Sequence, residues 1–422
     1  MLLIEVLKAD PNAAKEGLIK KSFPHPELVD TVIELDEQRK KSKLELDTLL
    51  AERNKLSKEI GILMKNKDPK AEEVKNRVLE LKSEIEVAEK DFQSIEEKLF
   101  DNLVELPNLP AAIVPEGKTA EDNIVDFEVD VIPPAIDQAL SHWDLASKYD
   151  IIDFDLGSKL TGSGFPVYKG KGAALQRALI SFFLSEATAA GYTEMMVPHM
   201  VNEDSAFATG QLPDKEGQMY HVTGDNLYLI PTAEVPLTNL YRDVILKESD
   251  FPIKLTGYTP CFRREAGSYG KDVRGLNRLH QFDKVEIVQI QHPDKSYDTL
   301  KDMCNHVEGL LKSLELPYRI LRLCGGDMSF ASALTYDFEV YSVAQERWLE
   351  VSSVSNFESF QSNRLKLRYR TEDNKRVLAH TLNGSALALP RILAAILEVY
   401  QTSDGIKVPK VLQKYTGFDF ID

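Results

Sequence analysis

Four arginines gather in one short stretch of the chain, between two segments in which apolar and polar residues alternate. They are Arg263, Arg264, Arg274 and Arg278. The alternation predicts two β-strands joined by a long loop, within the stretch from Thr256 to Gln289. A guanidinium group matches phosphate oxygens in pairs, so arginines at this density favour a polyphosphate ligand. With Glu265 and Glu286 beside them, they predict a ligand site rather than a solvated hairpin.

A second candidate site lies at Thr232, Ala233 and Glu234, where a predicted strand turns into a helix. At such a turn a hydroxyl and a carboxylate can face one small ligand. Thr232 could also cap the helix, and the two roles are compatible.

A third group of candidates, Glu350 to Ser353, is expected at the end of a predicted strand. Hard cations prefer oxygen ligands, so Glu350, Ser352 and Ser353 predict a magnesium or phosphate contact. An exposed strand end without function is the alternative.

The last candidates fall in HTLNGSALALPRILAAILEVYQ, which we interpret as a strand, a glycine turn and a helix. Asn383, Gly384 and Ser385 would then lie before or at the helix N-terminus, where free N–H groups suit polar ligands. Arg391 falls inside the helix, after a proline compatible with the first turn. It is either a snorkelling surface residue or part of a site.

The residues from about 27 to 105 are rich in Lys, Glu and Leu, and their apolar positions recur every three or four residues. This heptad seam stops at Asp68–Pro69 and then resumes, which predicts two long antiparallel helices packed along one seam. Arg39, Ser42 and Arg53 interrupt the first seam. A coiled coil that dimerises two chains is the alternative, as is a solvated arm without an RNA partner.

Two prolines, Pro107 and Pro110, follow the second helix and mark a linker. We therefore expect an N-terminal domain over residues 1–108 and a catalytic domain over 109–422. In the second domain we predict loop and strand over 142–172, and then helices over 173–190 and 296–316. TEMMVPHMV is predicted as a strand that Pro198 interrupts, at a sheet edge or an interface.

The composition is that of an ordinary globular protein, with 43% hydrophobic and 28% charged residues. A net charge of −16 argues against indiscriminate nucleic-acid binding, and we expect neither a DNA nor a membrane partner. Three cysteines without metal-ligand spacing fit a reducing compartment. The first residues lack the basic leader of a targeting peptide, so a cytoplasmic location is expected.

The motifs resemble those of the seryl-tRNA synthetases of bacterial type, within class II of the aminoacyl-tRNA synthetases. The resemblance rests on TGQLP, TAEVP, FRREAGSYGKDVRG, ALPR and the helical arm, and it extends over essentially the whole chain. It implies an α+β fold: an antiparallel sheet flanked by helices, preceded by a two-helix coiled-coil arm. It also implies a homodimer that activates L-serine with ATP and Mg²⁺. The seryl group then passes to the 3′-terminal adenosine of tRNA(Ser). The arm would bind this tRNA, either within one subunit or across the dimer. Use of tRNA(Sec) stays open.

The resemblance also implies roles for individual residues. Arg263 would contact the ATP α-phosphate and the serine carboxylate, and Glu265 the adenine. Phe282 and Arg391 would stack on opposite faces of the adenine. The complete expected ATP set is Arg263, Arg264, Glu265, Phe282, Glu350, Val351, Ser352, Ser353 and Arg391, with Glu350 and Ser353 as the magnesium contacts. The expected serine set is Thr232, Ala233, Glu234, Arg263, Glu286, Asn383 and Ser385. Arg263, Glu286 and Arg391 are the expected catalytic residues.

Two departures from the family pattern stand next to motif residues. Arg264 occupies a position where a smaller residue is common, and Pro390 one where glycine is familiar. Three other functions fit the sequence less well. A ligase that loads a carrier protein would not need the arm, and a regulatory RNA-binding relative would have lost Arg263, Glu286 or Arg391. A synthetase for threonine or proline fits TAEVP and the arm poorly.

Overall fold

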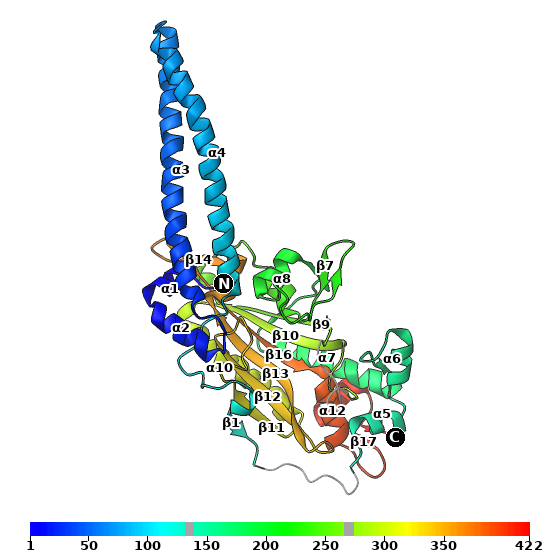
Figure 1. The fold of residues 1–422 in the computed structure, drawn as a ribbon. Coiled ribbons are helices and arrows are strands. Elements are labelled where there is room, and N and C mark those ends of the chain that lie inside the picture. Colours follow the sequence, from blue (N-terminus) through cyan, green and yellow to red (C-terminus); the bar gives the residue numbers. More distant parts are fainter. Residues whose placement is uncertain (131–138, 266–273) are drawn as a thin grey trace. The chain divides into compact units, whose positions relative to one another are not determined.

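The computed structural model describes residues 1–130, 139–265 and 274–422. The chain divides into two compact units, Met1–Leu109 and Pro110–Asp422 (Figure 1). None of the helices in the described ranges is long and apolar enough to cross a membrane.

The first unit is helical throughout. Its helices are α1 (Ile4–Ala9), α2 (Pro11–Lys20), α3 (Leu28–Lys65) and α4 (Lys70–Glu105). The two long helices lie side by side as a hairpin (Figure 1). Leu81, Ile85 and Ala88 of α4 are buried at the spacing of four and three that a coiled-coil seam requires. The predicted two-helix arm, with its turn before Lys70, is confirmed.

The polar residues in the first seam have a visible role at one position. Arg39 is half-buried and its guanidinium donates to Asp36 at 2.7 Å. Asp36 is only 3% exposed and also pairs with Lys8 of α1 at 2.5 Å. These cations hold the pKa of the Asp36 carboxyl well below its usual range, against the opposing effect of burial. The ion network thus ties α1 to the base of the arm.

The second unit is built on an eight-stranded sheet in the order β1–β11–β12–β13–β16–β10–β9–β4. Its strands are β1 (Ile124–Glu128), β4 (Thr193–Glu194), β9 (Ile253–Phe262), β10 (Gln281–Gln291), β11 (Tyr318–Arg322), β12 (Leu334–Ser342), β13 (Arg347–Glu358) and β16 (His380–Ala388). All neighbours in the sheet pair antiparallel except β4, which runs parallel to β9 at the edge. The expected antiparallel sheet flanked by helices is confirmed.

Helices cover one face of this sheet. They include α7 (Gly170–Ala189), α10 (Ser296–Ser313) and α12 (Leu389–Val399). Phe183 of α7, Val307 of α10 and Leu393 of α12 share one buried core with Val285 and Ile287 of β10. Because side chains alternate along a strand, Lys284 and Glu286 point to the opposite face. The helix layer therefore supports the sheet from behind, and the part of the opposite face that carries Lys284 and Glu286 is left for a ligand.

Smaller elements surround the sheet. The remaining helices are α5 (His142–Lys148), α6 (Phe154–Leu160), α8 (Glu203–Thr209), α9 (Glu234–Asn239), α11 (Ser359–Leu365) and α13 (Lys410–Thr416). The remaining strands are β2 (Ile152–Asp153), β3 (Val167–Tyr168), β5 (Met200–Asn202), β6 (His221–Val222), β7 (Leu227–Leu229), β8 (Ile245–Lys247), β14 (Arg368–Arg370), β15 (Arg376–Leu378), β17 (Ile406–Lys407) and β18 (Phe420–Ile421). They form four small sheets of two or three strands.

Three local predictions were wrong. Residues 142–172 contain the two helices α5 and α6 beside β2 and β3. The expected glycine turn at Gly384 does not exist, because Gly384 lies inside β16, where a Cβ atom would crowd the side chain of Val354. Glu350 to Ser353 lie in the middle of β13 and not at its end. TEMMVPHMV forms two separate strands, β4 and β5, and β4 lies at the expected sheet edge.

Candidate active site

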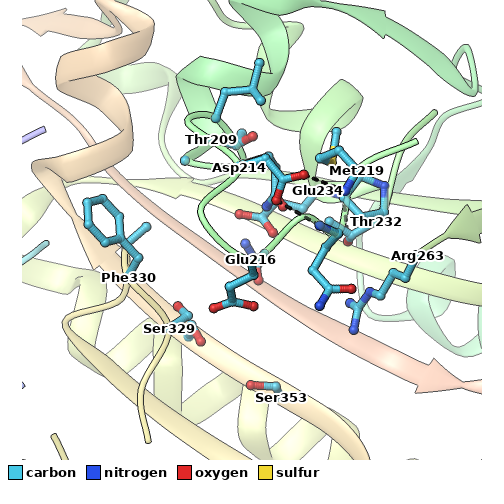
Figure 2. A pocket seen from close by; sticks show the side chains of 18 of the residues that line it. Thr209, Asp214, Glu216, Met219, Thr232, Glu234, Arg263, Ser329, Phe330 and Ser353 are labelled. Atoms are coloured by element: carbon cyan, nitrogen blue, oxygen red, sulfur yellow. Dashed lines mark hydrogen bonds between the residues drawn. The ribbon is translucent and has the colours of Figure 1, made fainter. Parts of the chain in front are cut away.

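Two adjoining pockets open on the face of the sheet opposite this helix layer. The larger is a cleft of about 520 Å³ and the smaller has about 100 Å³. They share six wall residues, which are Arg263, Glu265, Arg278, Lys284, Glu350 and Ser385. Figure 2 shows Thr232, Glu234 and Arg263 along one side of the cleft, with Ser329, Phe330 and Ser353 along the other. Two ligands, or two parts of one ligand, can therefore meet at a common boundary.

Strand register explains why residues far apart in the chain line this face. Phe282, Lys284 and Glu286 follow one another at every second position of β10, so their side chains share one face. Glu286 pairs directly with Ser385 of β16, and Asn383 of β16 pairs with Ser355 of β13. Three central strands thus deliver one continuous polar surface.

A bulge in β13 brings Glu350 and Ser353 to the same face. Residues three apart in a regular strand point to opposite sides of a sheet. Here Phe338 of β12 pairs with Ser352 whereas its neighbour Glu339 pairs with Glu350, which leaves Val351 as an extra residue. An extra residue shifts the alternation by one position. Both Glu350 and Ser353 consequently line the larger cleft.

A buried charged cluster lies at the floor of the cleft. Lys284 Nζ lies 2.5 Å from Glu286 Oε2 and donates to Thr232 Oγ1 at 2.8 Å. The Thr232 hydroxyl in turn donates to Glu286 at 3.2 Å and accepts the backbone N–H of Glu234. Lys284, Glu286, Thr232 and Glu234 are each at most 8% exposed. Thr232 therefore both orders the start of α9 and links the lysine to the carboxylate.

Glu234 lies in the same cluster, and the pKa of its carboxyl is raised. Burial, and then the neighbouring charge of Glu286, raise the pKa of Glu234 to about 7. Its Oε1 accepts a 2.6 Å hydrogen bond from Gln361 Nε2, which also donates to the carbonyl of Thr209. The Gln361 carbonyl is held by Thr381 at 2.7 Å. Gln361 thus fixes Glu234 against the loop that begins at Thr209.

Cationic and aromatic side chains line the smaller pocket. The guanidinium of Arg263 lies 5.3 Å from the centre of the Phe282 ring. Arg391, near the start of α12, donates to the carbonyl of Glu350 at 2.6 Å and to that of Asn277 at 3.1 Å. Burial lowers the pKa of Arg391 from its usual value. Arg391 is therefore an anchored residue of the pocket wall and not a snorkelling surface residue.

The residues present fit one hard cation. Glu350 and Ser353 offer a carboxylate and a hydroxyl to the larger cleft, and Mg²⁺ is usually held by one or two such groups plus phosphate oxygens and water. Asp337, opposite Ser353 on β12, has a buried Oδ1 atom without a hydrogen-bond partner in the described ranges. Burial and then Glu350 raise the pKa of Asp337. The described residues contain no cluster of three or more His, Cys, Asp and Glu side chains suited to a metal.

Comparisons with known proteins agree with this geometry. Residues 1–110 match the seryl-tRNA synthetase N-terminal domain, and residues 220–400 match the class II tRNA synthetase core domain (G, H, P, S and T). The serine–tRNA ligase of Salinibacter ruber is 49% identical over 421 residues, covering 99% of this chain and 98% of that protein.

The chain belongs to the seryl-tRNA synthetase family.

Two solved structures of this family are also similar. The seryl-tRNA synthetase of Pyrococcus horikoshii complexed with ATP has a TM-score of 0.91 and 33% identity, covering 100% of this chain and 99% of that one. The cytoplasmic serine–tRNA ligase of Naegleria fowleri in complex with AMP has a TM-score of 0.88 and 27% identity, with the same coverage.

Most residues expected from the family resemblance come together at the two pockets. Those in the wall of the larger cleft are Thr232, Glu234, Arg263, Glu265, Glu286, Glu350, Ser353, Asn383 and Ser385. Phe282, Val351, Ser352 and Arg391 line the smaller pocket. Ala233 and Arg264 line neither pocket, because Ala233 is fully buried and Arg264 is exposed. The loop segment Ser268–Arg274, which we expect to contact the acceptor end of tRNA, lies outside the described residues except for Arg274.

Sequence reasoning missed Lys284 and Gln361. Lys284 could have been found, because FDKVEI places a lysine between Phe282 and Glu286 on the same side of a predicted strand. Gln361 carries no local signal, since it follows the end of β13 in a short helix and meets Glu234 only through the fold. Asp214 was also missed; it accepts the N–H groups of Gln218 and Met219 and shapes the loop over the cleft (Figure 2).

Proposed function

We propose that this chain is a serine–tRNA ligase, which forms seryl-adenylate and pyrophosphate from L-serine and ATP and then transfers serine to the 3′-terminal adenosine of tRNA(Ser). The observation that carries the proposal is the boundary shared by the two pockets. Arg263 lines both pockets, between the buried Glu234–Glu286–Lys284 cluster and the Phe282–Arg391 wall. The full-length likeness to serine–tRNA ligases supports the same function.

The larger cleft fits a small amino acid with an ammonium group and a hydroxyl. Glu234 and Glu286 are acceptors for these two donors, and Thr232, Asn383 and Ser385 complete the polar lining. A site built to pair a hydroxyl rejects alanine, because binding alanine would leave buried polar groups without partners. Discrimination against alanine follows from the burial of Glu286, which is 1% exposed.

The smaller pocket fits the nucleotide. Phe282 offers an aromatic face to the adenine, Arg391 covers its other side, and Glu265 accepts from the exocyclic amine. Arg263 holds the serine carboxylate near the α-phosphate, so that a carboxylate oxygen attacks phosphorus and pyrophosphate leaves. Arg263 stabilises the negative charge that develops there, and catalysis needs positioning and charge rather than a covalent nucleophile.

Mg²⁺ would be held by Glu350 and Ser353, and when bound it would neutralise phosphate charge. The helical arm binds tRNA(Ser), and use of tRNA(Sec) is tested by charging each tRNA separately.

The enzyme acts as a homodimer in the cytoplasm, where ATP and tRNA are available. The edge position of β4 and the 97% exposure of the neighbouring Met196 support a subunit interface at this edge.

Serine-dependent pyrophosphate exchange tests the proposal. With ATP and Mg²⁺ we expect exchange that serine stimulates and that alanine and threonine do not. Arg263→Ala should lower kcat by about 100- to 1,000-fold, which is the usual effect of removing one donor that stabilises transition-state charge. Arg263→Lys is the matched control: it keeps the charge but not the planar fork, and it should restore only part of the rate. Absence of serine-stimulated exchange in the unmodified protein would overturn the proposal.

A further inference from the structure

The first residues of α5 form a docking platform for the segment that leads into β10. The guanidinium of Arg274 lies 4.9 Å from the ring of Trp143. Gly275 has a φ of +69°, and a Cβ atom at this position would lie 2.3 Å from His142 Nε2. Leu276 then donates its backbone N–H to His142 Nε2 at 2.9 Å. Three successive residues therefore meet two side chains of α5, and glycine is needed for the close approach.

The His142 ring is fixed from its other side by Glu398 of α12. His142 Nδ1 lies 2.8 Å from Glu398 Oε1, which also accepts the backbone N–H of His142. Both side chains are fully buried. Because the Leu276 N–H can only donate, Nε2 must be the acceptor and Nδ1 must carry the proton. The tautomer and orientation of His142 are thus set by the two bonds together.

A second chain of hydrogen bonds leads from Glu398 to Asn277, the next residue of the same segment. Ser342 donates its hydroxyl to Glu398 Oε2 and accepts from Gln345 Nε2 at 3.0 Å. Gln345 Oε1 in turn accepts from Asn277 Nδ2 at 2.9 Å. One buried carboxylate therefore holds Leu276 through His142 and holds Asn277 through Ser342 and Gln345.

The segment held in this way forms part of the nucleotide pocket. Leu276 and Asn277 line the smaller pocket together with Arg391. Arg391 donates to the carbonyl of Asn277, and it lies on α12 two turns before Glu398. Two residues of helix α12 therefore hold Leu276–Asn277: Glu398 through other side chains and Arg391 directly. The contact with Asn277 also orients Arg391.

We propose that His142 and Glu398 are positioning residues for ATP, which they act on only through Leu276, Asn277 and Arg391. This inference rests on the proposed assignment of the smaller pocket to the nucleotide. Neither side chain reaches the serine cluster, so their loss affects ATP binding selectively.

Two substitutions at one position separate the two bonds of His142. In His142→Asn the amide takes the place of Nδ1, so the bond to Glu398 is kept and Leu276 loses its acceptor. In His142→Gln the amide oxygen reaches the place of Nε2, so the Leu276 bond is kept. In serine-dependent pyrophosphate exchange we expect the KM for ATP to rise about tenfold in His142→Asn and at most about threefold in His142→Gln. The KM for serine should change less than about twofold in both.

The controls separate positioning from general support of the fold. His380→Asn makes the same change at a half-buried histidine, the first residue of β16, whose ring contacts Ser296 and which does not line either pocket. It should lower the melting temperature without a selective rise in the KM for ATP. Ser342→Ala cuts the second chain of hydrogen bonds and should reproduce the ATP effect if His142→Asn does not fold. Equal KM changes for ATP and serine, or unchanged ATP kinetics in both His142→Asn and Ser342→Ala, would refute the inference. The unmodified protein's serine-dependent exchange reports separately on the proposed function.

Discussion

The buried carboxyl of Glu234 lowers the free energy of unfolding of the protein when it is ionised. Its pKa is raised from 4.5 to about 7, first by burial and then by Glu286. The folded state therefore keeps a proton that the unfolded state loses between these two values. The resulting penalty is fully present above about pH 7 and disappears as the pH falls towards 4.5.

Glu234→Gln should remove this penalty and stabilise the protein at alkaline pH. The shift from 4.5 to about 7 corresponds to about 3 kcal/mol of unfolding free energy. We expect a gain of this order near pH 8 and less than half of it near pH 5.5, measured by urea denaturation. Serine activation should be lost in the same variant, because the amide has no charge for an ammonium group. A stability difference that does not change with pH would contradict the assignment.

Gln361 is expected to act on serine through Glu234. Gln361→Met keeps the size of the side chain but removes the donor shared by Glu234 and the Thr209 carbonyl. Losing a hydrogen bond to a charged group costs about 1.5–3 kcal/mol, so the KM for serine should rise about tenfold or more. The KM for ATP should stay within about twofold. Gln401→Met, at another buried glutamine that bonds the Leu140 backbone, is the matched control. If both variants behave alike, Gln361 has only a structural role.

Single functional residues could be predicted from the sequence only where the residues that indicate the site lie close together in the chain. Arg263, Glu265 and Glu286 could be found because arginines and carboxylates cluster within one strand–loop–strand pattern. Gln361 and His142 could not, because each acts through a partner more than a hundred residues away in the chain. No periodicity within a short window contains that information.

Elements were predictable where a repeat was long. Helices α3 and α4, which carry the heptad pattern, have 38 and 36 residues, so the arm could be predicted from the spacing of its apolar residues. Helices α5 and α6 have seven residues each, too few for a periodic pattern to stand out. The bulge at Val351 depends on pairing with β12, which the sequence of β13 alone does not specify. The placement of Glu350 beside Ser353 therefore required the sheet.

The prediction about the proposed homodimer concerns the edge strand β4. Met196 follows this strand and is 97% exposed. A large apolar side chain beside an unpaired strand edge is typical of an interaction surface. Met196→Arg should weaken the proposed homodimer, which sedimentation at low micromolar concentration would detect as monomer. Met64→Arg changes an exposed methionine of the arm, 56% exposed, and should leave the mass unchanged. A dimer unaffected by Met196→Arg would locate the interface elsewhere.

At the scale of the whole molecule, the two units are expected to divide the reaction. The residues that line both pockets all belong to the second unit, Pro110–Asp422. Activation of serine should therefore not need the distal arm, whereas recognition of tRNA should. Replacing residues 50–84 with a short Gly–Ser turn tests this division and keeps the packed cluster of Leu46, Ile85 and Ala88.

The shortened arm should leave serine-dependent pyrophosphate exchange within about twofold of the unmodified protein. Charging of tRNA(Ser) should fall on the order of 100-fold in kcat/KM, because several cationic contacts to the phosphate backbone are lost. The removed segment contains seven lysines, five of which are Lys55, Lys58, Lys65, Lys67 and Lys70. Changing these five lysines to glutamine in the full-length arm is the matched control for charge alone. Both variants should also show a weaker dependence of charging on salt concentration, since fewer counterions are released on binding. Unchanged charging by the shortened protein would show that the distal arm does not contact tRNA.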